Sequence, residues 1–309
     1  MEPDLTFKQL CNLWQQDKKN LVKQSTMAAY SLLIEKYLIP YFENISDINN
    51  ASVQSFMQEG LKNGLSLKSV RDIVVVLRMV MKFASSLGLP VNWNYRIKFQ
   101  QKNNSDEISV LTVAHQKKLI EYLESHPSYK NLGILICLST GLRIGEICGL
   151  KWQDINLSLG FLVVNKTVSR IYSANSPAKK TEIKITSPKT INSYRTIPLP
   201  ARLVEIIGSL HDSVNDAHFL VSNSLQPIEP RSYRNCFYKL LDHLGIPKLK
   251  FHSLRHTFAT RCIENNADYK TLSSILGHAD ISTTLNLYVH PSTEQKRRCI
   301  ENMLASLGS

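Results

Sequence analysis

One stretch of the chain, residues 251–260, carries side chains that suit the chemistry of a phosphate group. His252 and Arg255 are three positions apart, so on a helix they project from one face. An imidazole takes up or releases a proton, whereas a guanidinium keeps a positive charge in a planar fork. We therefore expect this pair to handle a proton and to hold an anionic oxygen at one site.

Three other motifs supply further reactive groups. The sequence TGLRIGE contains Arg143, with Glu146 one helical turn later, and LGHAD contains His278. Near the carboxyl end, YVH contains Tyr288. These motifs add a second guanidinium, a second imidazole and a phenol that could act as a nucleophile.

With these motifs in this order, the chain resembles the tyrosine recombinases of the phage integrase family. The resemblance extends from about Thr6 to Leu304 and implies a site-specific recombinase, or integrase, acting on double-stranded DNA recombination sites. Such an enzyme cleaves and rejoins DNA strands through a covalent 3′-phosphotyrosine. The catalytic residues that the resemblance implies are Arg143, Lys189, His252, Arg255, His278 and Tyr288.

Metal-free cleavage of a phosphodiester needs a nucleophile, cations beside the phosphate oxygens and an acid for the leaving oxygen. Arg143 and Arg255 suit the second task, because a guanidinium offers two parallel N–H groups and stays protonated. Glu146 could hold Arg143 in place. Tyr288 must lose its proton, since a phenol titrates near pH 10, and the resemblance makes His252 the acceptor.

The remaining two roles come from the resemblance alone. Lys189 follows a predicted strand, and the resemblance places it on a hairpin, where it would protonate the leaving 5′ oxygen. His278 would donate a hydrogen bond to the scissile phosphate. Tyr194 departs from the pattern, because the family often has a basic residue there, so the local phosphate contact is open.

Each of these residues alone has a plainer interpretation. Arg143 with the glutamate that follows it could be a surface ion pair, Lys189 a loop lysine, and Tyr288 one of twelve tyrosines. His252 and His256 have the spacing of a zinc pair, but no acidic residue follows the first histidine as in H-E-x-x-H. We therefore predict no metal and no cofactor. Taken together, the six residues, each in its own motif, favour the recombinase over these plainer interpretations.

The elements that position these residues form two predicted domains. Helices are expected at 6–18, 25–40, 49–64 and 66–87, with Pro40 ending the second. By resemblance, residues 1–89 form a helical core-binding (SAM-like) DNA-binding domain; any other four-helix bundle is the alternative.

Residues 90–107 have few periodic apolar positions and are expected to form a linker. Residues 108–309 would form a mixed α/β catalytic domain, so the fold class is mainly α with a small antiparallel sheet. Strands are predicted at 161–168 and 182–186. Helices are predicted near 112–125, from 201, at 230–244, through the central stretch and at 269–276.

A last helix, 291–307, is predicted to start at Pro291, with Ile300, Met303, Leu304 and Leu307 in one apolar stripe. The resemblance implies that this helix docks on a neighbouring protomer, which would give a homotetramer on two DNA duplexes. Docking on its own domain is the alternative.

Composition agrees with a DNA-binding protein in a reducing compartment. The chain has 37 Lys and Arg against 25 Asp and Glu, a net charge of +12, and both predicted domains are basic. Six cysteines form no C-x-x-C pair, which argues against a zinc knuckle or disulfide framework. No secretion signal or long uncharged apolar segment is present, so we expect a cytoplasmic protein without a membrane partner.

Several functions share these features. Integration or excision of a mobile element is the first choice, with Xer-like chromosome dimer resolution as the alternative and accessory recombination factors as additional partners. A type IB topoisomerase-like relaxing enzyme would use the same chemistry, and a DNA-binding protein without catalysis would keep the basic surface. The target DNA sequence cannot be read from the chain, because base recognition depends on a few side chains in the grooves.

Overall fold

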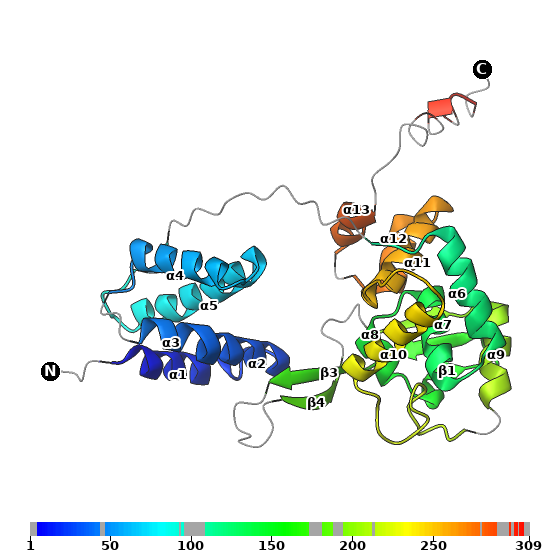
Figure 1. Cartoon of the computed structure of the whole chain (residues 1–309), viewed down its shortest axis with the longest axis horizontal. Helices are drawn as coiled ribbons and strands as arrows, with labels where there is room; N and C mark the ends of the chain where they lie inside the picture. The colour runs from blue at the N-terminus through cyan, green and yellow to red at the C-terminus, as the bar shows by residue number, and fades with distance from the viewer. Residues whose placement is uncertain are drawn as a thin grey trace. The chain divides into compact units, whose positions relative to one another are not determined.

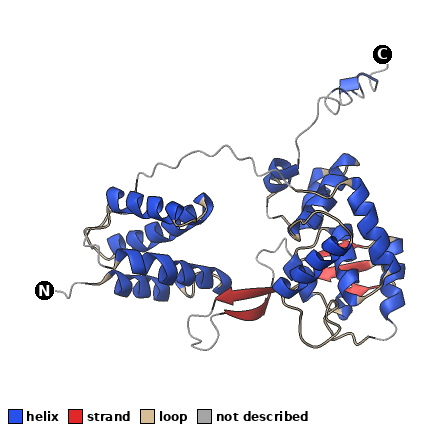
Figure 2. Cartoon of the chain, in the orientation of Figure 1, coloured by secondary structure: helices blue, strands red, loops and turns tan. Residues whose placement is uncertain are grey.

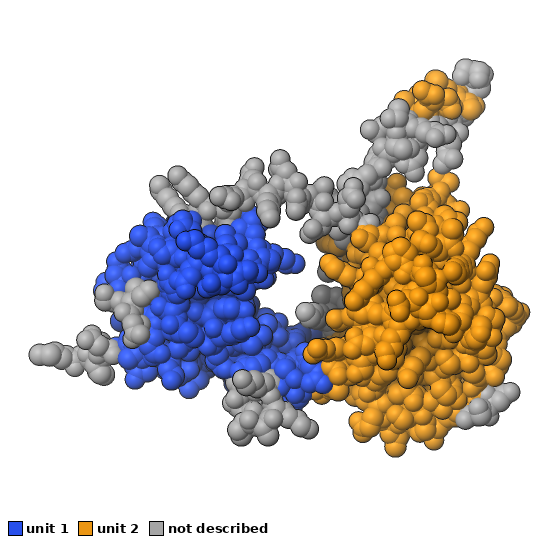
Figure 3. Space-filling view, viewed as in Figure 1, with its two compact units in different colours: residues 1–105, 170–182 blue, residues 106–169, 183–309 orange. Residues whose placement is uncertain are grey.

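The structure is a computed structural model of the 309-residue chain. It describes residues 5–43, 47–92, 94–95, 109–172, 181–187, 194–211, 214–278 and 280–288, with Arg297, Ile300, Glu301 and 303–305; for 286–288 it describes the backbone alone. The chain divides into two compact units, as Figure 3 shows. Unit 1 comprises residues 1–105 with 170–182, and unit 2 comprises residues 106–169 with 183–309.

The amino-terminal segment of unit 1 is helical, and its helices begin where the sequence predicts. Thr6, Asn49 and Ser66 each accept a backbone N–H from the first turn of the helix that follows. Such caps satisfy N–H groups that have no partner inside a helix. The elements, visible in Figure 1, are α1 (Phe7–Lys18), α2 (Gln24–Leu33), η1 (Ile34–Leu38), α3 (Ile39–Phe42), α4 (Asn50–Lys62) and α5 (Leu67–Ser86).

The prediction that Pro40 ends the second helix is wrong, because helical structure continues from Gln24 to Phe42. A proline has no N–H for the residue four positions earlier, and its ring crowds that carbonyl. Here one wide π-helical turn, η1, comes directly before Pro40, and the N–H of Ile39 reaches back five residues to Ile34. The wider turn relieves the conflict that would otherwise stop the helix.

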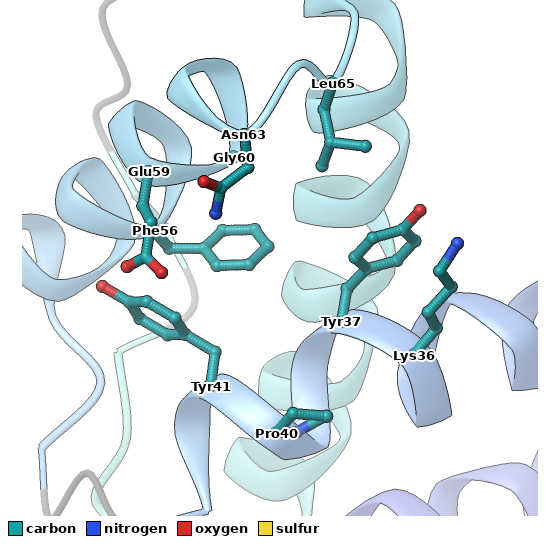
Figure 4. A pocket seen from close by; sticks show the side chains of 9 residues that line it. All are labelled: Lys36, Tyr37, Pro40, Tyr41, Phe56, Glu59, Gly60, Asn63 and Leu65. Carbon is teal, nitrogen blue, oxygen red and sulfur yellow. The ribbon is translucent and has the colours of Figure 1, made fainter.

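Unit 1 also contains an open pocket of about 440 Å³, shown in Figure 4. Tyr37, on η1, and Phe56, on α4, line it together with Tyr41 of α3. The rings of Tyr41 and Phe56 meet edge to face at 5.0 Å, and burial and the nearby Glu59 raise the pKa of Tyr41. Arg143, His252, Arg255 and His278, the four predicted catalytic residues whose side chains are described, do not line this pocket.

Unit 2 is built around a buried helix, α7 (Tyr129–Thr140), which has buried residues on all its sides. The other described helices of this unit are α6 (Val113–Ser125), α8 (Ile144–Gly149), η2 (Trp152–Asp154), α9 (Ala201–His211), α10 (Pro230–His243), α11 (His252–Glu264), α12 (Tyr269–Leu276) and α13 (Ser282–Tyr288). Among them, α6, α9, α10, α11 and α12 begin close to the predicted positions, whereas α8, η2 and α13 have no counterpart among the predicted helices.

The strands, red in Figure 2, form two small sheets. In the first, β1 (Ile155–Asn156), β2 (Phe161–Val164) and β5 (Arg195–Pro198) lie in the order β1-β2-β5, and both pairings are antiparallel. In the second, β3 (Thr167–Tyr172) pairs with β4 (Thr181–Thr186). The structure therefore confirms the fold class, mainly α with a small antiparallel sheet.

The predicted strand at 182–186 is present as β4, but the prediction of one strand over 161–168 is wrong. Asn165 and Lys166 interrupt it, because both side chains turn to the buried carboxylate of Asp154, at 2.9 Å and 2.6 Å. The two halves then join different sheets. A further strand, β5, pairs with β2 and has no counterpart among the predicted strands.

Two predicted segments lie largely outside the described residues. One is the linker, 90–107, and the other is the carboxy-terminal helix, 291–307. In the latter, Ile300, Glu301 and residues 303–305 are helical, with 58% of Ile300 and 50% of Met303 exposed. Within the described part of the chain, no helix has the length and apolar character needed to cross a membrane.

Two glycines offer a matched test of the packing of unit 2. A Cβ at Gly133 on α7 would lie 2.5 Å from Tyr233 Oη and 2.8 Å from Val221 Cγ2. The Gly133→Ala change should therefore lower the free energy of unfolding by about 1 to 3 kcal/mol. At Gly208 on α9 a Cβ meets nothing within 4 Å, so Gly208→Ala should stabilise the helix by up to about 1 kcal/mol. Urea titration followed by circular dichroism measures both; equal effects would contradict the packing described.

Candidate active site

The buried guanidinium of Arg255 is anchored at the carboxyl end of α7. Gly141 ends that helix in a left-handed conformation, with φ +67°, which glycine adopts without strain. Its carbonyl accepts a hydrogen bond of 2.8 Å from Arg255 Nη1. A Cβ at Gly141 would be 2.7 Å from both Phe258 and Leu276. Arg255 is 1% exposed, and its hydrogen bond ties α11 to the end of α7.

Arg143 stands immediately before α8 and is held by Glu146, the partner that its spacing predicts. Its Nη1 donates to Glu146 Oε1 at 2.9 Å, and its backbone N–H donates to Oε2 at 2.9 Å. A third hydrogen bond, of 3.3 Å, joins Arg143 Nη2 to the carbonyl of Gly277. The Arg143 side chain is 37% exposed whereas that of Glu146 is 5% exposed. The buried carboxylate of Glu146 thus holds the guanidinium of Arg143 and leaves part of that side chain accessible to solvent.

A third guanidinium, from Arg195 on β5, completes the surroundings of Glu146. Arg195 Nη2 and Nη1 donate to the two carboxylate oxygens at 3.0 Å and 3.2 Å, and Nε donates to the carbonyl of Ile275 at 2.6 Å. Burial raises the pKa of Glu146, but the hydrogen bond and charge of Arg195, with the charge of Arg143, bring the pKa below its ordinary value. Glu146 is therefore a carboxylate shared by two cations.

The sequence analysis assigned no role to Arg195, although a weak signal exists. The pattern Arg195-Thr-Ile197-Pro alternates buried and exposed positions, so a charged residue lies on the same buried face as Ile197. A buried guanidinium needs a partner. That reasoning could have marked Arg195, but it could not have identified Glu146, 49 positions away, as the partner.

His252 is the first residue of α11 and lies, as predicted, on the same helix as Arg255. Its ring meets that of His256 edge to face at 4.5 Å between centroids. Burial, His256, Arg255 and Arg143 together lower the pKa of His252 to about 4. Of these causes, the neighbouring positive charges are the ones that a bound anion would offset.

His278 follows Gly277, which ends α12 in the left-handed conformation with φ +65°. Its Nδ1 lies 2.7 Å from the hydroxyl of Thr284, a fully buried residue of α13. Burial and the charges of Arg255, Arg143 and Arg195, with His252, lower the pKa of His278 to about 4. The ring is thus neutral at neutral pH and fixed to the helix that carries position 288.

The structure places the other two predicted residues incompletely. Lys189 belongs to residues 188–193, which lie outside the described part of the chain, between β4 and β5. Tyr288 is the last residue of α13, and its side chain is not among those described. Arg143, His278 and the α11 pair His252 and Arg255 come from three segments and lie near enough that the arginine charges lower the pKa of both histidines.

This arrangement suits an anion that also needs a proton acceptor. Two guanidinium groups supply charge and directed N–H donors, while two imidazoles remain neutral at neutral pH. Among the described residues, no three His, Cys, Asp or Glu side chains come together in a way that could hold a metal ion. The chemistry the geometry supports is therefore binding and polarising a phosphate by fixed cations.

Two family models match the chain. The phage integrase family matches residues 109–295, and the N-terminal SAM-like domain of phage integrases matches residues 6–60. The chain is 27% identical to a tyrosine recombinase XerC-like protein of Caldanaerobacter subterraneus subsp. tengcongensis, over 97% of this chain and 83% of that protein.

Solved structures of similar fold include two integrases. One is the Tn1549 transposon integrase in complex with transposon right end DNA, with a TM-score of 0.76 and 21% identity over 96% of this chain and 99% of that one. The other is a lambda integrase tetramer bound to a Holliday junction, with a TM-score of 0.66 and 16% identity over 93% of this chain and 78% of that one.

The charge of Arg143 gives a direct test of the site's electrostatics. It lowers the pKa of His252 and His278, but it is not among the causes of the lowered pKa of His256, which are burial and Arg255. Arg143→Gln should therefore raise the pKa of the first two rings and leave that of His256 unchanged. NMR titration of the ring nitrogens measures all three.

The same titration has a consequence for stability. Both histidines have a folded pKa of about 4, below the ordinary 6.5, so the unfolded chain binds more protons between these values. The folded chain should lose stability as the pH falls through that window, and Arg143→Gln should weaken this loss. A uniform rise of all three pKa values, or no change in any, would contradict the assigned contacts.

Proposed function

The chain belongs to the phage integrase family, and on this premise we propose that it is a site-specific recombinase with Tyr288 as its nucleophile. The observation that carries the proposal is the pair Arg143 and Arg255, anchored at the carbonyls of Gly277 and Gly141 beside two neutral imidazoles. A phosphodiester has one negative charge and two oxygens available to such forks. The substrate is double-stranded DNA at recombination sites, and the reaction needs no metal or nucleotide.

The proposed steps balance without a cofactor. Tyr288 Oη attacks phosphorus as its proton passes to His252, whose low pKa rises when the phosphate charge offsets Arg143 and Arg255. The bond from phosphorus to the 5′ oxygen breaks, and Lys189 gives that oxygen a proton. His278 donates a hydrogen bond to the phosphate. The products are a 3′-phosphotyrosine and a 5′-hydroxyl, and attack by a second 5′-hydroxyl reverses the reaction on another strand.

The proposed domains are the core-binding domain at 1–89, the linker at 90–107 and the catalytic domain at 108–309. The SAM-like model over 6–60 and the integrase model over 109–295 support this division. In the catalytic domain, the Arg143 segment and the α11 segment meet at the end of α7. We place the protein in the cytoplasm, where DNA and accessory recombination factors are accessible.

The biological task we propose is integration or excision of a mobile element. Its support is the fold shared with an integrase that was solved with transposon end DNA. The XerC-like relative favours chromosome dimer resolution as the second candidate. The DNA beside the gene separates them, because a mobile element would be bounded by recombination sites.

The covalent intermediate tests the function. Wild-type protein is incubated with a library of nicked duplexes of randomised sequence, and DNA that resists removal by detergent is recovered and sequenced. We expect wild-type protein to retain a defined duplex, whereas Tyr288→Phe should retain none, because the attacking oxygen is gone. Tyr269→Phe, at a 39%-exposed residue of α12, is the control and should behave as wild type. Equal adduct from Tyr288→Phe and wild type would refute the proposal; binding without any adduct would favour a non-catalytic DNA-binding protein.

We propose that the working assembly is a homotetramer on two duplexes, joined by the helix at 291–307. The apolar residues Ile300, Met303 and Leu304 are 58%, 50% and 48% exposed, which suits a partner surface. The lambda integrase of similar fold was solved as a tetramer on a Holliday junction. Docking of the helix on its own domain is the alternative.

Removal of residues 291–309 tests the exchange of this helix. Exchange between protomers predicts that the shortened chain still binds one site but no longer assembles cooperatively, because the apolar stripe that joins the protomers is absent. Analytical ultracentrifugation of the protein on the captured duplex measures the assembly. The point variant Ile300→Asp should weaken it in the same direction. Unchanged tetramers from both variants would reject exchange.

A further inference from the structure

Arg195 is the residue through which three parts of the site are connected. It lies on β5, two residues after the segment 188–193 that contains Lys189. Its Nη atoms hold both oxygens of Glu146, which in turn hold Arg143. Its Nε holds the carbonyl of Ile275, near the end of α12, just before Gly277 and His278. Arg195 therefore contacts Glu146, which holds Arg143, and the end of α12, which precedes His278.

The carboxylate of Glu146 could not stay in place with Arg143 as its single partner. It is 5% exposed, and a buried charge without adequate compensation is strongly unfavourable. Arg143, at 37% exposure, supplies less of that compensation than Arg195, which is 6% exposed and contacts both oxygens. Loss of Arg195 would favour the protonated, neutral acid, which attracts Arg143 less.

The carbonyl of Ile275 is the second anchor. It accepts from Arg195 at 2.6 Å, and two residues later the carbonyl of Gly277 accepts from Arg143 at 3.3 Å. The two arginines thus hold the end of α12 from two sides. His278 leaves this end and reaches Thr284 on α13.

We propose that Arg195 is a positioning residue for DNA cleavage: it fixes Glu146 beneath Arg143 and holds the end of α12, so that Arg143 and His278 address the same phosphate. This inference rests on the proposed function. The proposed role requires the shape of the Arg195 guanidinium as well as its charge. Its three nitrogens donate to three acceptor atoms, the two carboxylate oxygens of Glu146 and the carbonyl oxygen of Ile275. A lysine has one flexible ammonium group and cannot reproduce both contacts.

The test compares Arg195→Lys and Arg195→Met with wild type on the duplex that wild-type protein captures covalently. Single-turnover adduct formation should be about 10- to 100-fold slower in Arg195→Lys, the usual effect of losing an orienting partner, and slower still in Arg195→Met. Affinity, measured by fluorescence anisotropy, should change less than about threefold, because many other basic residues attract DNA. The acid side of the pH–rate profile should move to higher pH in Arg195→Met, since Glu146 loses its main cation.

A substrate with a neutral methylphosphonate at the scissile position gives a readout that a purely structural role would not change. Arg143 has less charge to stabilise there, so the defects of Arg195→Lys and Arg143→Gln should shrink together. Because part of the Arg195 effect passes through Glu146 to Arg143, Arg195→Lys should slow the Arg143→Gln variant by a smaller factor than it slows wild type. Independent, multiplying defects would overturn the proposal.

Arg202→Met is the matched control. Arg202, on α9, is 66% exposed and pairs with Glu124 and Glu205. Its loss should leave adduct formation unchanged, because exposed ion pairs contribute little. A full wild-type rate in Arg195→Lys would refute the positioning role while leaving the recombinase intact, whereas absence of a Tyr288-dependent adduct in wild type would refute the function itself. Should Arg195→Met fail to fold, the comparison of Arg195→Lys on the two substrates still decides the question.

Discussion

The site depends on one buried carboxylate placed between two guanidinium groups. Glu146 lies 2.9 Å from Arg143 and 3.0 Å from Arg195, and it is almost inaccessible to solvent. Removing one partner of such a buried pair typically costs about 3 to 5 kcal/mol, because the other charge remains uncompensated. The arrangement therefore favours the conformation in which Arg143 contacts Glu146. It also favours a position of β5 from which Arg195 contacts both Glu146 and the end of α12.

This constraint makes the cluster ready for an anion before any arrives. Arg143, Arg195 and Arg255 gather near one another, although like charges repel, because a carboxylate and three backbone carbonyls hold them. Nearby imidazoles respond by staying neutral, which leaves them able to accept a proton. Under the proposed function, a phosphate that enters would relieve the repulsion. Binding energy and catalytic alignment would then come from the same fixed groups, as expected for stabilisation by preorganised charges.

Local signals in the sequence predict the helical framework well. Thr6, Asn49 and Ser66 cap helices because a side-chain oxygen competes locally for backbone N–H groups, so the signal needs no knowledge of distant residues. The same is true of the pair Arg143 and Glu146, three residues apart. The catalytic roles of all six predicted residues stay predictions, and for Lys189 and Tyr288 the side chains also lie outside the described part of the chain.

Predictions fail where a neighbouring turn or a distant partner overrides a local preference. Pro40 does not end its helix because the π-helical turn before it absorbs the missing hydrogen bond. The strand after Phe161 breaks because Asp154, several positions earlier, attracts Asn165 and Lys166. The contacts of Arg195 are not predictable from local sequence, because its partners are on α8 and α12 and no spacing rule connects them to β5.

The central claim is that two arginines from distant segments hold the phosphate that Tyr288 attacks. The most direct measurement is a crystal structure of the wild-type protein covalently trapped on its captured duplex. The account predicts phosphorus bonded to Tyr288 Oη, with its non-bridging oxygens about 3 Å from guanidinium nitrogens of both Arg143 and Arg255. Phosphorus bonded to another side chain, or a phosphate that neither guanidinium reaches, would contradict it.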